Sequence, residues 1–357
     1  MSPLPDLPVL PSTPAVLVDL AVARANIARF QSYADAHGLK VRPHIKTHKL
    51  PQIARLQLAA GAVGITCQKL SEAEAMLAGE PAIRDVLVTY NIVGADKLAH
   101  LAMLARRARL SVVADSEAVV AGLSATFAAA PEPLAVLVEC DTGAHRCGVA
   151  NPEAAAALAR TIAASPGLVF GGLMTYPPVG AAAAVEAFMR EAKARIESAG
   201  IAVPVVTSGG TPSMMQAAEA PVTTEYRPGT YVYNDRSLVE RGVCGWDDCA
   251  LTVLATVVSV PAPDRAIIDA GSKTLTSDLL GLSGYGHVLG RPDIAIDQLS
   301  EEHGRLVSRG PIGLAVGERL RVVPNHACVV TNMVDTVHVL DAGTLTPWPV
   351  AARGRIV

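Results

Sequence analysis

The most distinctive polar segment of the chain is Arg-Pro-His-Ile-Lys-Thr-His-Lys, residues 42–49, at the end of a β-rich run. Lys46 lies in this segment among Arg42, His44 and His48. Neighbouring cations and desolvation both lower the pKa of a lysine amine, as a lysine that forms a Schiff base requires. The segment alone fits two interpretations equally: a Schiff-base lysine, or a basic solvated loop that binds an anion.

Two glycine-containing segments offer backbone N–H groups that no side chain obstructs. The first segment comes after an apolar run and is Ser208-Gly209-Gly210-Thr211. The second lies further along the chain and is Arg227-Pro228-Gly229-Thr230-Tyr231. In barrels of alternating strands and helices, the loops after the last two strands commonly build a phosphate site. Each segment by itself is also typical of an ordinary tight turn. Together with Lys46 on the same rim, they fit a single cofactor that carries a phosphate.

A third constellation is Pro-Asn-His-Ala-Cys, residues 324–328. If this segment is a strand, His326 and Cys328 point to the same face, and imidazole with thiolate is a pair suited to zinc. The pattern alone favours the other interpretation, a buried thiol beside a solvated histidine.

The elements that must position these residues alternate between apolar β-rich runs and stretches of helical period, which predicts a (β/α)8 barrel. Barrels place their chemistry at the carboxyl ends of their strands. The polar residues at or just after the predicted strands are Lys46, Cys67, Asn91, Asp115, Arg146, Tyr176 and the stretch 208–210. A doubly wound open sheet would need a glycine fingerprint after its first strand, and AVLVDLAVARAN has none. The eight predicted strands are AVLVDL from Ala15, KVRPHIK from Lys40, AVGITC from Ala62, VLVTYNIV from Val86, RLSVVAD from Arg109, PLAVLVECD from Pro133, LVFGGLMTY from Leu168 and PVVTSGG from Pro204.

After Tyr233 the chain changes to strand-like runs separated by Gly and Pro turns, which predicts a β-rich domain. We therefore expect a barrel over residues 14–235 and a β-rich domain over residues 236–357 that carries the His-x-Cys pair. The second domain can also include residues 1–13.

Composition limits the classes of function. The 357 residues carry 30 basic and 33 acidic side chains, a formal charge of −3, and contain no dense Lys/Arg run, which argues against nucleic-acid binding. The first residues lack the basic and apolar regions of a signal peptide or membrane span. Six scattered cysteines suit a reducing compartment, so we expect a cytoplasmic protein.

At the level of motifs the chain resembles fold-type III pyridoxal-phosphate enzymes of the D-threonine aldolase and eukaryotic-type D-serine dehydratase family, which have an alanine-racemase-like barrel. The similarity extends from TPAVLVDL at Thr13 to Ala352. The matching blocks are RPHIKTHK, GITCQKLSEAE from Gly64, DTGAHRCGV from Asp141, the SGGT loop, EYRPGTY from Glu225, IIDAGSK from Ile267 and SEEHG from Ser300.

The resemblance implies pyridoxal 5′-phosphate (PLP) as the cofactor, with its Schiff base on Lys46. It further implies that Arg146 contacts the phenolic oxygen of the pyridine ring and that Tyr176 lies beside the ring. It also implies a divalent metal, Zn²⁺ or Mn²⁺, at His326 and Cys328. The remaining residues implied around the cofactor and its phosphate are Thr207, Ser208, Gly209, Gly210, Gly229, Thr230 and Tyr231.

One departure concerns the base that acts on the β-hydroxyl of the substrate. Some aldolases of the family have a histidine shortly after the tyrosine that corresponds to Tyr176, but this chain continues Pro-Pro-Val-Gly-Ala. His287, His303 or a metal-bound hydroxide remain as candidates, and we take His303 as the working choice. We expect Cys67 and Cys147 to be packed thiols.

The resemblance implies a lyase that acts on small D-β-hydroxy-α-amino acids. We expect aldol cleavage to glycine and an aldehyde; the alternative is a dehydratase that yields a 2-oxo acid and ammonia, which Cys328 favours. An amino-acid racemase is less favoured, because it needs a second base on the opposite face of the ring and no metal. A non-catalytic PLP-binding protein is less favoured, because this chain adds over 100 residues and a possible metal pair to the barrel. The family also implies a homodimer.

Overall fold

The computed structural model describes residues 11–357, which form two compact units. The barrel unit comprises residues 28–46, 51–229 and 355–357. The sheet unit comprises the residues up to Ile27, together with 47–50 and 230–354. Each unit has its own sheet, and the two are described separately below.

The barrel unit is built on an eight-stranded parallel sheet in the order β2-β9-β8-β7-β6-β5-β4-β3. A parallel bridge between His44 and Thr66 joins the segment after β2 to β3, so the first and last strands of this order also meet. This closed arrangement confirms the predicted alanine-racemase-type barrel. The strands are β2 Lys40–Val41, β3 Ile65–Cys67, β4 Asp85–Asn91, β5 Arg109–Ala114, β6 Leu134–Cys140, β7 Leu168–Thr175, β8 Val206–Gly209 and β9 Glu225–Arg227.

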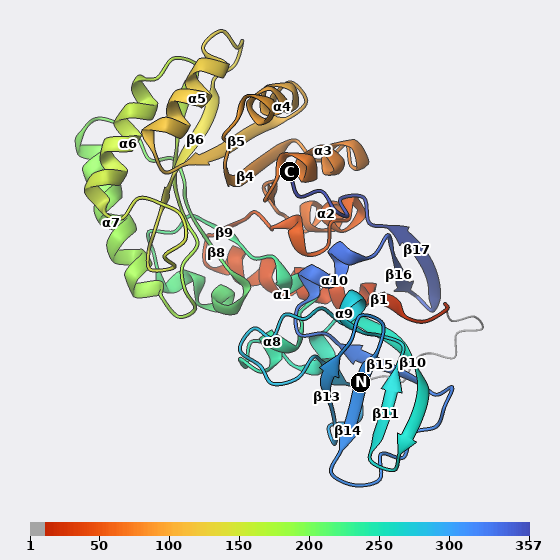
Figure 1. Cartoon of the computed structure of the whole chain (residues 1–357). Helices are drawn as coiled ribbons and strands as arrows, with labels where there is room; N and C mark the ends of the chain where they lie inside the picture. The colour runs from red at the N-terminus through yellow and green to blue at the C-terminus, as the bar shows by residue number, and fades with distance from the viewer. Residues whose placement is uncertain (1–10) are drawn as a thin grey trace. The chain divides into compact units, whose positions relative to one another are not determined.

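Helices alternate with these strands and cover their outer face; in Figure 1, α5 to α7 lie outside the strands. Apolar side chains from strands and helices form one continuous core between the two layers. The elements are α1 Leu20–Ala36, η1 Ile45–Thr47, α2 Pro51–Ala59, α3 Leu70–Gly79, α4 Ala95–Ala105, α5 Glu117–Phe127, α6 Pro152–Ala164, α7 Ala182–Ser198 and the 3-10 segment η2 Thr211–Glu219.

The sheet unit contains a mostly antiparallel sheet in the order β13-β14-β11-β10-β1-β16-β17, with β15 pairing with both β10 and β12. Short helical segments connect the strands. The elements are β1 Ala15–Asp19, η3 Thr230–Val232, α8 Arg236–Val239, η4 Trp246–Asp248, β10 Leu251–Ala262, β11 Arg265–Ile268, α9 Ser272–Leu275, β12 His287–Val288, β13 Ile294–Leu299, β14 Gly304–Ser308, β15 Arg319–Val323, α10 Ala327–Met333, β16 Thr336–Asp341 and β17 Thr344–Pro349.

The structure corrects the identity of one barrel strand. The run Ala15–Asp19 was predicted as the first barrel strand, but it pairs antiparallel with β10 and parallel with β16 in the sheet unit. The eighth barrel strand is instead Glu225–Arg227, whose two charged residues are buried and hydrogen-bonded. A run that is buried on both faces has the same apolar pattern in either sheet, so the sequence could not assign it.

The compact units also differ from the contiguous division that the sequence suggested between residues 235 and 236. Residues 14–27, 47–50 and 230–235 belong to the sheet unit. Within residues 11–357, no helix has both the length and the apolar character that crossing a membrane requires.

Candidate active site

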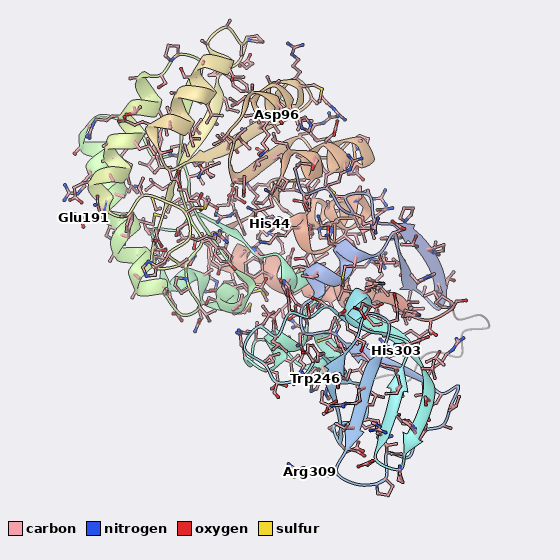
Figure 2. The ribbon with its side chains drawn as sticks, in the orientation of Figure 1. His44, Asp96, Glu191, Trp246, His303 and Arg309 are labelled. Carbon is pink, nitrogen blue, oxygen red and sulfur yellow. The ribbon has the colours of Figure 1, made fainter. Side chains whose placement is uncertain are left out.

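Lys46 lies in the short 3-10 turn η1, which residues 42–44 separate from β2. Lys46 is partly exposed, while its neighbours from Val41 to Leu50 are buried. The backbone N–H of Lys46 donates to Nδ1 of His44 at 3.3 Å. Nε2 of His44 lies 3.1 Å from Oε1 of Gln68, and Nε2 of Gln68 donates to the Thr89 carbonyl at 2.8 Å. Because Nδ1 of His44 accepts, these bonds are consistent with a neutral imidazole that donates from Nε2. Figure 2 shows His44 inside the barrel unit.

A cavity of about 620 Å³ lies at the carboxyl ends of the strands in the barrel unit, within the usual size of a small-molecule site. Gln68 connects its wall to the Lys46 turn through His44. Burial raises the pKa of Glu139 in this wall, and Arg146 partly opposes that shift. The lining residues are Gln68, Thr89, Tyr90, Asn91, Val93, Lys97, Glu139, Arg146 and Cys147.

Arg146 and Tyr176 lie together, with the guanidinium carbon 4.8 Å from the centre of the tyrosine ring. Tyr176 is 42% exposed, which is unusual for so large a ring beside a cavity-lining residue. The structure therefore brings together two of the residues predicted to contact a cofactor ring.

A chain of buried polar side chains supports the ends of β8 and β9. Arg227 donates to the Thr207 hydroxyl at 2.7 Å and to the Thr175 carbonyl at 2.7 Å. Thr207 donates to Glu225 at 2.8 Å, and Glu225 accepts from Arg42 at 2.8 Å. Burial lowers the pKa of Arg227 to about 10. Since both roles of the Thr207 hydroxyl are occupied by these residues, Thr207 supports the strand ends from inside the barrel.

The predicted phosphate segment is close to this chain. A Cβ on Gly209 would lie 2.9 Å from the Arg227 carbonyl oxygen, so only glycine fits there. Gly210 has φ +114°, and η2 begins at the next residue without a side-chain cap on its N-terminal amides. The Gly229 N–H donates to the Thr211 hydroxyl at 3.1 Å, which links the two glycine segments. Backbone amides gathered in this way suit a phosphate group.

In the sheet unit, His326 is held by a carboxylate that the sequence did not indicate. Nδ1 of His326 lies 3.2 Å from Oδ2 of Asp235, a fully buried residue whose other oxygen accepts from the Ser237 hydroxyl at 2.7 Å. Burial alone would lower the pKa of His326, but the Cys328 thiolate and Asp235 raise it to about 10. Two anionic groups around one imidazole favour its protonated form when no metal is bound, and a metal would have to displace the Nε2 proton, with Nδ1 still bonded to the carboxylate.

The His326–Cys328 segment is not a strand, which corrects the predicted geometry. His326 is the extended N-cap residue of α10, and Cys328 lies in the first turn of that helix. The two side chains still lie within hydrogen-bonding reach of each other. The Cys328 sulfur lies 3.0 Å from the Thr47 hydroxyl and 3.7 Å from that of Thr230. Thr47, which directly follows Lys46 in the chain, thus contacts the thiol.

A nitrogen, a sulfur and an orienting carboxylate form a donor set that fits a divalent metal with two protein ligands. Among residues 11–357, no group of three or more His, Cys, Asp and Glu side chains is arranged to hold a metal. A metal here would keep open coordination positions, which is typical of catalytic sites.

The histidines considered as bases lie in different surroundings. His303 is an exposed residue in the turn between β13 and β14, where its carbonyl accepts from the Ser300 N–H. The ring of His287 stacks on Trp246, with centroids 3.8 Å apart, and burial lowers its pKa. Figure 2 labels both His303 and Trp246 in the sheet unit.

Sequence reasoning missed Gln68, Arg227, Asp235 and Thr47 as supporting residues. Gln68 and Arg227 lie inside blocks that carry the family resemblance, so their place in those blocks was a usable signal. Asp235 acts on a residue 91 positions away. No local pattern could have indicated that contact.

Comparison with known families gives two matches. Residues 18–237 match the model of the alanine racemase N-terminal domain, and residues 250–340 match that of a putative serine dehydratase domain. Together they cover most of both units.

Relatives with known names align over nearly the full length. D-Threonine aldolase from Arthrobacter sp is 36% identical over 96% of this chain and 93% of its own. The solved structure of D-threonine aldolase from Filomicrobium marinum superposes with a TM-score of 0.89 at 34% identity, covering 97% of each chain. D-threo-3-hydroxyaspartate dehydratase from Delftia sp. HT23 superposes with a TM-score of 0.88 at 32% identity, over 96% of this chain and 98% of that one.

Two further similar structures are of mutants of D-threo-3-hydroxyaspartate dehydratase. One is a cysteine-to-alanine mutant in the metal-free form, and the other is a mutant in which a histidine two positions earlier is replaced by alanine. The dehydratase therefore has a His-x-Cys spacing, as this chain has at His326 and Cys328.

Proposed function

The chain belongs to the family defined by the alanine racemase N-terminal domain, and from this premise we propose that it is a PLP-dependent lyase of the D-threonine aldolase type. Its substrates would be small D-configured β-hydroxy-α-amino acids. The observation that carries the proposal is the presence, in one chain, of a partly exposed Lys46 that is linked through His44 to Gln68 in the cavity wall, and of an oriented His326–Cys328 pair in the sheet unit.

Lys46 would hold the cofactor covalently, with Arg146 and Tyr176 beside its ring. The backbone amides of Gly209, Gly210 and the start of η2, with those around Gly229, Thr230 and Tyr231, would receive the phosphate, and Ser208 and Thr207 would support them. When bound, PLP withdraws electrons from the substrate Cα, so that a bond at this carbon can break. The directed hydrogen bonds from Lys46 to His44 and from His44 to Gln68 fix the turn in which the lysine lies.

A divalent cation at His326 and Cys328 would act as a Lewis acid toward the carboxylate or β-hydroxyl of the substrate. Asp235 orients the imidazole, and the Thr47 hydroxyl lies against the sulfur that would carry negative charge. A thiolate ligand favours Zn²⁺ over Mn²⁺, since it is the softer donor.

Aldol cleavage and dehydration differ in the proton that the protein removes. If a base removes the β-hydroxyl proton, the Cα–Cβ bond breaks and glycine and an aldehyde result. If Nζ of Lys46 removes the Cα proton, the β-hydroxyl leaves and a 2-oxo acid and ammonia follow. His303, which lies in an exposed turn, stays the proposed base for the β-hydroxyl proton.

The full-length similarity to D-threonine aldolases supports aldol cleavage. The alternative, a dehydratase, is favoured by one specific feature, the cysteine of the His-x-Cys pair, which the Delftia sp. HT23 dehydratase also has.

Product analysis with D-threonine separates the two reactions. We expect acetaldehyde and glycine in equal amounts, and loss of both after removal of the metal by a chelator. 2-Oxobutanoate without glycine would replace the aldolase assignment by the dehydratase. Conversion of L-alanine to D-alanine that survives chelation would instead identify a racemase, and a PLP-loaded protein that turns over no D-amino acid would contradict an enzymatic role.

We also propose that the protein is a homodimer, as the family resemblance implies. Light scattering of the purified protein should give twice the chain mass of 37.0 kDa, and a monomeric mass would contradict this.

A further inference from the structure

The segment between α8 and β10 contains two cysteines around a single tight turn. The turn is η4, closed by bonds from the Asp248 N–H to the Gly245 carbonyl at 3.1 Å and from the Cys249 N–H to the Trp246 carbonyl at 3.2 Å. The Gly245 N–H in turn donates to the Asp248 carboxylate at 2.9 Å. This winding returns the chain on itself: the Cys249 thiol donates to the carbonyl of Gly245, the residue after Cys244, at 3.8 Å, and Cys244 lies close enough to raise the pKa of Cys249.

The two thiols differ in accessibility. Cys244 is partly exposed and Cys249 is buried. The neighbouring Cys244, burial and the nearby Asp235 and Asp248 carboxylates all raise the pKa of Cys249. An oxidant from solvent therefore meets Cys244 first, and Cys249 is left to resolve the product, since reactivity follows thiolate character and access.

We propose that Cys244 and Cys249 are a reversible redox modification site that closes into an intramolecular disulfide and changes the geometry around His326. With a low-molecular-weight disulfide as oxidant, Cys244 attacks one of its sulfurs and releases one thiol. Cys249 then attacks the mixed disulfide, so that the Cys244–Cys249 bond forms, the second small thiol leaves, and both cysteine protons pass to the released thiols. The two cysteines lose two electrons and the small disulfide gains them.

The turn is tied by backbone contacts to the residue that orients His326. The Asp248 carbonyl accepts from the Asn26 amide at 2.8 Å and from the Asn234 amide at 3.0 Å. The Ala250 N–H donates to the Tyr233 carbonyl at 2.7 Å. Asn234, which has φ +52°, directly precedes Asp235, the partner of His326.

A second connection runs through Trp246, which is labelled in Figure 2. The Trp246 ring stacks on His287, and His287 pairs with Val323 in β15, three residues before His326. Any movement of the turn is thus passed to His326 through its carboxylate partner and through the strand that leads into it.

Bond formation requires movement, because a disulfide brings the sulfurs to about 2.05 Å, much closer than two unbonded thiols approach. We expect this contraction to shift the Asp248 carbonyl and, with it, Asn234 and Asp235. A displaced orienting carboxylate weakens metal binding by a histidine by about 10- to 100-fold. The expected loss of metal affinity rests on the proposed metal site, whereas disulfide formation does not.

The first experiment is incubation of the full-length protein with oxidised glutathione, followed by intact and peptide mass spectrometry. We expect a species that has lost two hydrogens, with a link between the peptides of Cys244 and Cys249, and full reversal by dithiothreitol. Cys244→Ser and Cys249→Ser should abolish the link, whereas Cys147→Ser, at an exposed cysteine of the barrel unit, should retain it. A glutathione adduct on Cys244 that never resolves, or a link between other cysteines, would overturn the proposal.

The second experiment measures Zn²⁺ affinity of the reduced and oxidised protein by competition with a chromogenic chelator. We expect oxidation to weaken Zn²⁺ binding by about 10-fold or more. Cys244→Ser, treated in the same way, should keep its affinity, which excludes oxidation of Cys328 as the cause. A disulfide that forms without any change in affinity would contradict the coupling to His326. If instead no Zn²⁺ binds the reduced protein, the metal part of the proposed function fails while the disulfide result still stands.

Discussion

Lys46 in the barrel unit and His326 in the sheet unit are held in different ways. Lys46 lies in a turn shortly after β2. Of the residues that fix this turn, His44 lies two residues before Lys46, and Gln68 directly follows the neighbouring strand β3. His326 is fixed by Asp235, and Cys328 by Thr47, across 91 and 281 residues of chain. The barrel topology itself gathers the first site, whereas the second depends on particular long-range contacts.

Removing Lys46 should have the largest effect. Lys46→Ala eliminates the covalent attachment of PLP and the amine that moves a proton at the substrate Cα, so turnover should fall by about 10³-fold or more. The visible absorption of the lysine-bound cofactor should disappear as well. Lys40→Ala, at an exposed lysine of β2, should change neither property. A Lys46→Ala protein that keeps the band would refute the assignment.

Asp235→Asn tests whether the sheet-unit site depends on a distant residue. The substitution keeps the size of the side chain but removes the negatively charged carboxylate beside Nδ1 of His326, so Zn²⁺ affinity should fall by about 10- to 100-fold. Titration calorimetry would measure this, with Asp335→Asn, an exposed carboxylate, as the control. Equal affinities of the two variants would show that Asp235 does not support the metal site.

Gly209→Ala tests the dense packing beneath the phosphate segment. The added Cβ would meet the Arg227 carbonyl oxygen at 2.9 Å and displace the ends of β8 and β9, at a cost of about 1–3 kcal/mol. We expect PLP binding to weaken by about 10-fold in a fluorescence titration, while Zn²⁺ binding is unchanged. Gly310→Ala, at a glycine without a positive φ and with open space around it, measures the cost of a new Cβ alone. Normal PLP affinity in Gly209→Ala would place the phosphate elsewhere.

Thr47→Val should have a smaller effect, on the metal alone. It preserves shape but removes the hydroxyl 3.0 Å from the Cys328 sulfur, so the thiolate loses one hydrogen bond worth about 1 kcal/mol. Zn²⁺ affinity should fall by about 5-fold in Thr47→Val. Thr47→Ser, which keeps the hydroxyl, should bind Zn²⁺ as the natural protein does. If Thr47→Val lowered the affinity for PLP but not that for Zn²⁺, Thr47 would instead stabilise the turn that contains Lys46.

Glu139→Gln should give the smallest effect, on the pH dependence of stability. Burial raises the folded-state pKa of Glu139 above its unfolded value, so its neutral form stabilises the fold fully below the unfolded pKa. That contribution is lost as the pH rises through the folded pKa. The variant, which does not titrate, should therefore gain about 1–3 °C in melting temperature over the natural protein between acidic and neutral pH. A gain that shrinks as the pH rises would contradict the sign of the shift.

The sequence predicted the barrel and placed Lys46 at the end of its second predicted strand, because strand ends and local motifs carry that information. That strand was predicted to run to Lys46, whereas β2 ends at Val41 and Lys46 lies in a 3-10 turn. The proximity of Arg146 to Tyr176 was implied by the family resemblance. It assigned Ala15–Asp19 to the wrong sheet, since a strand buried on both faces looks the same in either. It missed β9, because buried Glu225 and Arg227 resemble loop residues until their partners Arg42 and Thr207 are known. It treated residues 326–328 as a strand, although His326 caps a helix, and it could not indicate Asp235.

The most direct test of the account is borohydride reduction of the PLP-loaded protein followed by peptide mapping. Reduction makes the link between cofactor and lysine permanent, so the modified residue can be read by mass spectrometry. We predict a single pyridoxyl-phosphate adduct on Lys46. An adduct on Lys49, Lys69 or Lys97 with Lys46 unmodified would contradict the assignment of Lys46 as the cofactor lysine.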